Sequence, residues 1–568
     1  MKMISKIATI ALGLVSLGSS VFAQSLADAK KAIDAEQYQK AKTMLKNLTV
    51  TQAKEDENFF QLGWVYILQD YPDSAKAVFT QGLAVNPKSA LNYVGLGVVA
   101  RLNKDNAGAT SNFNQAISFT GKKESQPYLY IGRGYLMRLP NTKAVATADA
   151  DAAIAALSKG KLANPKDAEV ALELGNAYRA KRETSPAYEN YTTALTLDPK
   201  SPAANVAQGV LWSNAHNFED AVKQYQAAIA IDPNFGPAYR EWAETDLNWS
   251  FENRAVAVEK INEGVANFKK YMSLTDQSDE TLMRYADFLI SAGKYKELQE
   301  VAAQLSKSTN SNARALRYLG YAAYENKDYQ AGITALNNWF AKAGPNRILP
   351  RDYMYQGRLQ IASGKDTTAG ITTIRKAIEL DSTLASDGYN DILAVHKKKG
   401  DYLGQARTYE EITQRVRNRS TFADKVYSGI YYYYAFQYGK PQDSTLLAKA
   451  DTALSQSMRA SATPAPDVFL FKARIADLKD LDRNNIKGIA KPFYEKFIEI
   501  SAAKANPDNR TKTNLGEAYA YLGAYAEYKD KDEAKALEYY TKGKEADPSN
   551  KQVAAYFARK TAAPSKGK

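Results

Sequence analysis

The sequence predicts an all-α fold, a solenoid of about fourteen antiparallel helix pairs. Small and aromatic residues recur at constant offsets with a period of 34 residues, and runs of alternating β-branched residues, which are typical of strands, are missing. The chain of 568 residues is also longer than one compact core usually supports. An array of repeats or several domains is therefore expected.

The repeat is clearest around four glycines. In the first copy, the aromatic, aliphatic, small and helix-ending residues of the repeat are Phe59, Leu62, Gly63, Tyr66, Ala75, Phe79, Gly82 and Pro87. The same offsets return 34 residues later around Gly97, and again around Gly175 and Gly209. We expect the small residues to let the two helices of a pair approach closely, with aromatic side chains filling the gaps. Proline follows the second helix at Pro199 and Pro233, where it ends the helix.

This pattern resembles the tetratricopeptide repeat, and the resemblance covers nearly the whole chain. It implies a right-handed superhelix whose inner face is lined by the first helix of each pair. It also implies that the chain binds another macromolecule and is not an enzyme. Residues 488–499 are similar to a segment of exported repeat proteins of Gram-negative bacteria.

Looser copies of the repeat fill the rest of the chain. They centre on Ala29, Gly132, Ala243, Ala286, Gly320, Gly357, Leu393, Gly429, Ala473 and Gly523. In the copies at Gly132 and Ala243 the second helix resumes nine residues late, which we interpret as lengthened helices. Polar or Pro-rich breaks suggest an N-terminal array over 24–274, a degenerate middle array over 275–417 and a C-terminal array over 418–560 with a last capping helix. Residues 561–568 are expected to be a disordered tail.

The first 23 residues have the pattern of a secretory signal peptide. Lys2 and Lys6 precede the apolar run Ile7–Leu17, and Val21 and Ala23 are suitable for signal peptidase, which would leave Gln24 first. The run is shorter than the roughly 20 residues that span a bilayer, and no later stretch is long enough. The chain has no cysteine, which excludes a lipid anchor on cysteine, disulfides and thiolate metal sites. We expect a periplasmic or extracellular product.

The charge of the chain leaves two interpretations open. The formal charge of +13 becomes +11 when Lys2 and Lys6 are removed with the signal peptide. The excess either keeps solvated helix faces soluble or marks an anionic partner. For an exported chain, anionic glycans, lipid headgroups and acidic proteins are more available than nucleic acid, so no nucleic-acid partner is predicted.

The sequence gives little sign of catalytic chemistry. Its two histidines, His216 and His396, have no partner histidine at a metal-ligand spacing, and we expect the first in a turn and the second in packing. Ser363–Asp366 resembles part of a phosphate-binding loop but lacks its upstream glycine and its hydroxyl residue after lysine. No catalytic, cofactor or metal site is predicted, and the chain is expected not to be an enzyme.

The family's geometry places groove residues one, four and five positions after the first-helix glycine, and three before it. For this chain those offsets give the predicted groove residues Phe60, Trp64, Val98, Arg179, Arg240, Arg317, Tyr321, Tyr324, Arg358 and Tyr433. The apolar members either accept a helix or an extended peptide, or are covered by the opening helices. The arginines beside tyrosines suit carboxylates, phosphates and sugars. The alternative for Tyr433 is packing between repeats.

One specific site of the family, a clamp for peptide C-terminal carboxylates, is not expected. Asn176 matches one of its positions, but Leu172 stands in place of the lysine and Ala207 in place of the next asparagine. The function predicted from the sequence is a protein-binding scaffold of the cell envelope. The alternative is a binder of anionic glycan or lipid, such as a cell-wall polymer or lipopolysaccharide.

Overall fold

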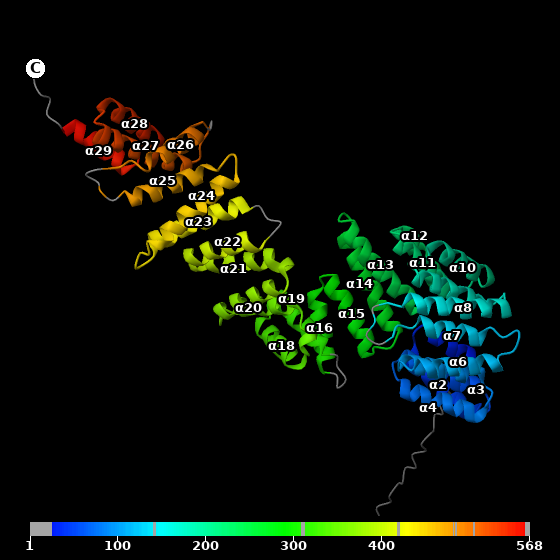
Figure 1. Cartoon of the computed structure of the whole chain (residues 1–568). Coiled ribbons are helices and arrows are strands. Elements are labelled where there is room, and N and C mark those ends of the chain that lie inside the picture. Colours follow the sequence, from blue (N-terminus) through cyan, green and yellow to red (C-terminus); the bar gives the residue numbers. More distant parts are fainter. Residues whose placement is uncertain are drawn as a thin grey trace, which may run out of the picture. The chain divides into compact units, whose positions relative to one another are not determined.

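A computed structural model describes residues 25–139, 142, 144–307, 313–416, 421–480, 482, 486–503 and 506–562 (Figure 1). Every regular element in these ranges is a helix, so the predicted all-α class is confirmed. The predicted signal peptide and residues 563–568 of the predicted tail lie outside the described ranges.

Within the described ranges, the α-helices alternate as first and second members of fourteen pairs, and α29 follows the last pair. The first eight pairs are α1 Leu26–Asp34, α2 Tyr38–Thr51, α3 Asp56–Leu68, α4 Pro72–Val85, α5 Ala90–Leu102, α6 Asn106–Phe119, α7 Gln126–Leu136, α8 Thr147–Ala163, α9 Ala168–Ala180, α10 Thr184–Leu197, α11 Pro202–Asn214, α12 Phe218–Ile231, α13 Gly236–Glu252, α14 Ala257–Leu274, α15 Asp279–Ser291 and α16 Tyr295–Lys307.

The remaining α-helices are α17 Arg314–Glu325, α18 Tyr329–Lys342, α19 Pro350–Ala362, α20 Thr367–Leu380, α21 Ala385–Lys399, α22 Tyr402–Arg415, α23 Thr421–Tyr438, α24 Thr445–Ala460, α25 Pro466–Lys479, α26 Lys491–Ala502, α27 Asn509–Tyr525, α28 Glu533–Ala546 and α29 Lys551–Ala562. Short 3-10 turns lie at Pro345–Arg347 and Ser382–Leu384, and a π turn lies at Ala526–Asp530. No helix in the described ranges combines the length and the apolar character that a membrane span needs.

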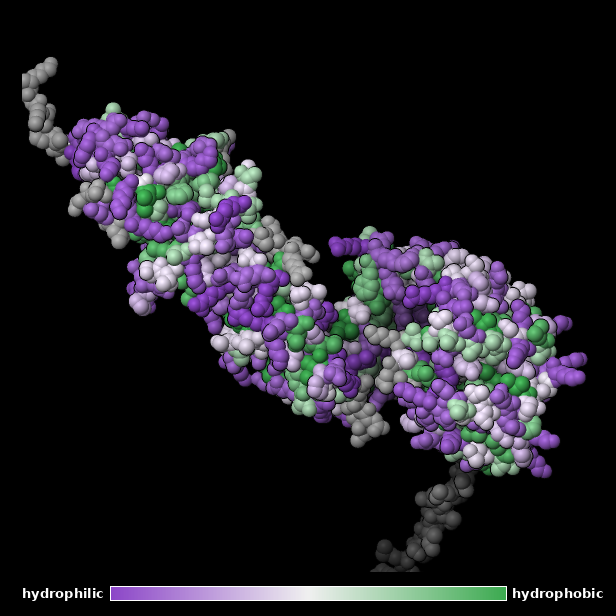
Figure 2. Space-filling model, viewed as in Figure 1, coloured by the Kyte–Doolittle hydropathy of each residue, from purple (hydrophilic) through white to green (hydrophobic). Residues whose placement is uncertain are grey.

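The chain divides into two compact units, residues 1–315 and 316–568, with the division inside α17. Each unit is a stack of helix pairs described by itself below. The array boundaries predicted near residues 275, 417 and 560 stay predictions. In the view of Figure 2 polar residues cover most of the surface, and hydrophobic residues form small scattered patches.

Proline ends the second helices as the sequence predicts. The helices α4, α10, α12 and α28 stop one residue before Asn86, Asp198, Asp232 and Asp547, and each of these residues precedes a proline. The side-chain oxygen of each also accepts a hydrogen bond from the backbone N–H two residues further on, over 2.9–3.0 Å. This local turn ends the helix and directs the chain toward the next helix pair.

The glycines at the repeat centres have the packing role that the sequence assigns to them. A Cβ placed on Gly63 would lie 2.3 Å from the ring of Phe79, and one on Gly175 would lie 2.4 Å from the ring of Tyr191. Both rings are fully buried, so neither can move aside. The aromatic ring of the second helix therefore occupies the space that any larger residue would need.

The two nine-residue insertions differ from each other. The insertion around Ala243 lengthens both helices of its pair as expected, since α13 and α14 have 17 and 18 residues. Around Gly132 the prediction is wrong for the first helix, because α7 has only 11 residues and a connection precedes α8. Pro140 disfavours a helical conformation at the residue before it, so this helix could not extend across the insertion.

Candidate functional site

The apolar inner face predicted for the first pairs is not an open groove. Phe60 and Val98 are fully buried, and Trp64 is 4% exposed. The ring of Tyr130 on α7 lies 4.6 Å from that of Phe60 and 4.8 Å from that of Trp64, centroid to centroid. Tyr130 and the Gln61 side chain of α3 are joined by a hydrogen bond of 2.9 Å. Helices two pairs apart thus touch, which closes this part of the inner face.

The opening helix belongs to the same core. Ala29, Ala32 and Ile33 of α1 are buried in one hydrophobic cluster with Phe60, Trp64 and the α7 residues. Of the two alternatives for this surface, the structure favours the second, in which the opening helices cover the apolar side chains. This packing removes Phe60 and Val98 from water and leaves them no surface to offer a partner, which argues against their predicted binding role. Trp64 still lines the cavity described below, so its binding role stays a prediction.

The first seven pairs close on themselves through Glu36, in the turn between α1 and α2. Its carboxylate accepts a hydrogen bond of 2.5 Å from Arg240 of α13 and one of 2.6 Å from the hydroxyl of Tyr271 of α14. Asp276 accepts a hydrogen bond of 2.7 Å from the backbone N–H of Gln39, at the start of α2. Residues more than 200 positions apart are thus joined, and Arg240, predicted to face a partner, serves this closure.

Replacing Glu36 by glutamine is expected to loosen this closure. Burial acts to raise the pKa of Glu36, but the charge of Arg240 and the bonds from Tyr271 and Arg240 outweigh it, so the pKa lies below its ordinary value. The closing contact is therefore present at neutral pH and lost in acid, and the substitution should remove about 2–3 kcal/mol from it at pH 7.

The chain lacks cysteine, so two introduced cysteines at Lys40 and Lys269 take spin labels specifically. The distance distribution between the labels should broaden in Glu36→Gln at pH 7. Glu57→Gln is the control, because Glu57 pairs with Lys30 at an exposed site and links only α1 to α3. Identical distributions in the wild type and Glu36→Gln would contradict the closure.

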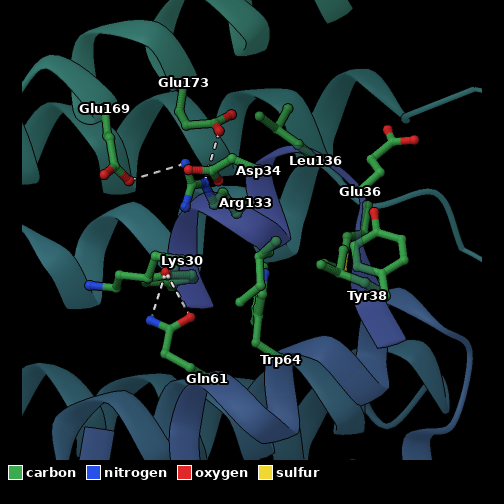
Figure 3. A pocket seen from close by; sticks show the side chains of 14 residues that line it. Lys30, Asp34, Glu36, Tyr38, Gln61, Trp64, Arg133, Leu136, Glu169 and Glu173 are labelled. Carbon is green, nitrogen blue, oxygen red and sulfur yellow. Dashed lines mark hydrogen bonds and ion pairs between the residues drawn. The ribbon is translucent and has the colours of Figure 1, made fainter. Parts of the chain in front are cut away.

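A cavity of about 310 Å³ lies inside this closed array (Figure 3). It is lined by Lys30, Ile33, Asp34, Glu36, Tyr38, Gln61, Trp64, Leu68, Tyr130, Arg133, Leu136, Met137, Glu169 and Glu173. These residues come from α1, the turn after it, the start of α2, and the inner helices α3, α7 and α9. The cavity therefore brings together residues up to 143 positions apart in the sequence.

Charged groups dominate one side of this cavity. Arg133 of α7 donates to Glu173 over 2.8 Å and pairs with Glu169 over 3.2 Å, so two carboxylates of α9 neutralise it. Lys30 pairs with Glu57 over 2.8 Å. Asp34 makes no hydrogen bond and no ion pair among the described residues. The pKa of Asp34 is raised to about 6, chiefly by desolvation and also by Glu169 and Glu173, against the opposing charges of Arg133 and Lys30.

A larger cavity of about 710 Å³ continues from the first and shares Leu136 and Glu173 with it. Arg179, Asn176 and Asn214 help to line it. Arg179 is a predicted groove residue, and it donates to the hydroxyl of Tyr191 over 3.1 Å. The structure therefore places Arg179 at a cavity that a partner could enter.

The predicted arginine and tyrosine residues of the second unit hold the fold together. Arg317 and Tyr321 are buried, and both donate to Asp352. Arg358 donates to Asp391 over 2.7 Å, and its guanidinium lies 5.8 Å from the ring of Tyr355. Carboxylates of the chain thus neutralise Arg317 and Arg358, which argues against the predicted role of these two arginines in binding an anionic partner.

The predicted groove tyrosines of this unit are only partly covered. Tyr324 is half-buried, with its ring 5.6 Å from that of Tyr355. Tyr433 is half-buried, with its ring 5.3 Å from that of Phe471, which favours the packing alternative. Neither lines a described cavity, so their binding role stays a prediction.

The histidines lie as expected, in a turn and in packing. His216 adopts a left-handed backbone conformation, with φ of 60°, in the turn before α12, and its Nδ1 lies 2.5 Å from Glu252. His396 lies at the end of α21, with Nδ1 2.8 Å from Asp401, the cap of α22. Within the described ranges, no cluster of His, Asp and Glu side chains is suited to hold a metal ion.

Models of the tetratricopeptide repeat family match residues 57–89, 172–234 and 286–347. These three stretches of the chain are tetratricopeptide repeats. The curated relatives that it matches include a DnaJ homolog subfamily C member 7 homolog of Dictyostelium discoideum, 27% identical over 19% of this chain and 19% of that protein. The human DnaJ homolog subfamily C member 7 is 25% identical over 28% of this chain and 40% of that protein. The chain thus matches less than half the length of each of these relatives.

Among solved structures, the C-terminal part of a TPR repeat-containing protein from Cytophaga hutchinsonii is 24% identical, with a TM-score of 0.34. The match covers 48% of this chain and 98% of that one. A tetratricopeptide repeat protein from Parabacteroides merdae is 11% identical over 48% of this chain and 99% of its own, with a TM-score of 0.31.

Several cavity residues were not singled out from the sequence, although the groove offsets contain them. Lys30 and Asp34 lie one and five positions after Ala29, and Arg133 lies one position after Gly132. Applying the offsets to the shortened opening pair and to the pair at Gly132 would have selected all three. Glu169 lies outside these offsets, and only the fold shows that it reaches Arg133.

Proposed function

We propose that the protein is a protein-binding scaffold that holds a segment of its partner inside the N-terminal array. The observation that carries this proposal is the pair of adjoining cavities, of about 310 and 710 Å³, within tetratricopeptide repeats. Tetratricopeptide repeats act as protein-binding scaffolds. A cavity of this size admits a few side chains or an extended peptide, whereas the collapsed apolar face has no room for a helix.

We further propose that this scaffold works in the cell envelope after export. The motivation is the signal-peptide pattern of residues 1–23. Mass spectrometry of the protein purified from its native host should give a chain that begins at Gln24. An intact Met1 in the native protein would contradict export by this route.

Photo-crosslinking tests the scaffold. A photoreactive residue at Asn214, which is exposed and lines the larger cavity, should give a reproducible adduct with one or a few proteins, identified by mass spectrometry. The control places the same group at Gln115, on the exposed face of the outer helix α6, where no adduct with those proteins is expected. Equal adducts at both positions, or none at Asn214, would contradict binding in the interior.

A further inference from the structure

The smaller cavity contains a carboxylate that the fold does not neutralise. Asp34 ends α1, and it makes no hydrogen bond or ion pair with any described residue. Asp34 is exposed to solvent through the cavity, but the surrounding repeats still desolvate its carboxylate, which disfavours the charged form. The neighbouring cations are committed elsewhere, since Arg133 pairs with Glu169 and Glu173, and Lys30 pairs with Glu57.

The charge balance around Asp34 is negative. The charged side chains that line the cavity are four acids, Asp34, Glu36, Glu169 and Glu173, against two bases, Lys30 and Arg133. Glu36 is neutralised from outside the cavity by Arg240. An anion would therefore meet repulsion and find Arg133 occupied, whereas a cation would meet Asp34 without displacing any existing pair.

The remaining walls suit an organic cation with an apolar stem. Trp64 rises into the cavity from α3, and Tyr38 lies at its side (Figure 3). Aromatic faces attract ammonium and guanidinium groups, and Leu68, Leu136 and Met137 offer apolar contacts to methylene groups. The volume of about 310 Å³ lies at the small end of ligand pockets, which suits a single long side chain.

We propose that this cavity binds the ammonium or guanidinium group of a basic side chain, with Asp34 as its counter-ion. The inference rests on the proposed scaffold function and names the chemistry of the partner segment, which would carry a lysine or arginine. The cavity is not a metal site, because no cluster of metal ligands forms among the described residues.

Binding of a cation by Asp34 is coupled to pH. The pKa of Asp34 is raised to about 6 by burial, with Glu169 and Glu173 adding to the effect and with Arg133 and Lys30 opposing it. The carboxyl must lose its proton to pair with the ligand, so affinity should rise as pH increases from 5 to 7, and binding near pH 6 should release protons.

The test is titration calorimetry of the full chain with a blocked pentalysine peptide, in two buffers of different ionisation enthalpy. Acetyl-lysine amide and acetyl-arginine amide form the other arms, which separate recognition of a single side chain from recognition of a peptide. Asp34→Asn should weaken pentalysine binding at pH 7 about tenfold or more and abolish its pH dependence, as expected for the loss of one charge-assisted contact. The matched control is Asp73→Asn, which removes the same charge from an exposed site on the outer helix α4.

Asp34→Asn should fold, because it removes an unpaired carboxylate, and a stability equal to or above that of the wild type at pH 7 confirms this. Absence of binding to the wild type, or equal affinities for Asp34→Asn and Asp73→Asn, would overturn the proposal. In the crosslinking experiment, an Asn214 adduct that survives Asp34→Asn would keep the scaffold and reject the cation site. If the photoreactive residue at Asn214 gives no adduct even without Asp34→Asn, the scaffold function itself is rejected.

Discussion

Replacing Asp352 by alanine should destabilise the start of the second unit by about 3–5 kcal/mol, which is the largest effect expected in this protein. Asp352 is fully buried and accepts hydrogen bonds from Arg317, Tyr321 and Trp339, over 2.8, 2.6 and 3.0 Å. It also accepts one of 2.7 Å from the backbone N–H of Leu349 at the start of α19. The substitution would leave a buried guanidinium and several buried donors without an acceptor.

Hydrogen–deuterium exchange of the full chain measures this loss locally. Amides of α17, α18 and α19 should exchange about 10²–10⁴ times faster in Asp352→Ala, because their protection reports the free energy of local opening. Asp391→Ala is the matched control, since it also removes the partner of an arginine on a first helix, Arg358. The side chains of Arg358 and Asp391 are 21% and 33% exposed, so we expect Asp391→Ala to lower the free energy of unfolding by about 1 kcal/mol or less.

A second substitution tests the cause of the Asp352 effect. If the orphaned charge of Arg317 carries most of the loss, Arg317→Met combined with Asp352→Ala should be more stable than Asp352→Ala alone. A similar acceleration of amide exchange in Asp352→Ala and Asp391→Ala would show that burial does not decide the strength of these ion pairs.

Replacing Asp246 by asparagine should stabilise the first unit, increasingly so as the pH rises. Asp246 of α13 is fully buried, and it accepts a long hydrogen bond of 3.4 Å from Asn267. One carboxyl oxygen has no hydrogen-bond partner among the described residues. The pKa of Asp246 is raised to about 7, chiefly by burial and also by Glu263, against the charge of Lys260.

The sign of this pH dependence follows from the raised pKa. The folded state holds the proton more tightly than the unfolded state, so the contribution of Asp246 to stability is fully present below pH 3.8 and is lost as pH rises through about 7. Between pH 5 and 8 the wild type should lose about 2–3 kcal/mol relative to Asp246→Asn.

Urea unfolding at pH 5 and pH 8 measures the difference. Four of the five tryptophans lie in residues 1–315, so their fluorescence reports mainly on this unit. Glu219→Gln is the control, because it neutralises an exposed carboxylate on the second helix of the preceding pair. A constant gap between the wild type and Asp246→Asn across this pH range would contradict the raised pKa.

Much of the architecture could be predicted because it depends on local rules. Gly63, Gly97, Gly175 and Gly209 identify four of the pairs, since only glycine leaves room there for the facing aromatic ring, and Asx-Pro pairs mark the ends of several second helices. The insertion at Gly132 was misplaced because a count of residues does not say whether a helix or a connection absorbs them. Pro140 was the signal that could have decided it.

The candidate site was harder to predict. Position within a repeat says which face of a helix a residue occupies, but it does not say how tightly the superhelix winds. Phe60 and Trp64 were correctly assigned to the inner face, yet the winding brings Tyr130 onto them and closes it. Arg317 and Arg358 were likewise placed on first helices, but their acid partners lie on the following first helix, one repeat further along the chain.

The sequence by itself determined the helix pairs, their number, their order and the contacts within each pair, because these depend on residues within about 34 positions of each other. Only the tertiary structure decided that Glu36 meets Arg240, that Asp34 faces a cavity without a counter-ion, and that the apolar inner face is closed. These features depend on the curvature summed over many repeats, and a small change in the angle between successive pairs would separate or join the residues concerned.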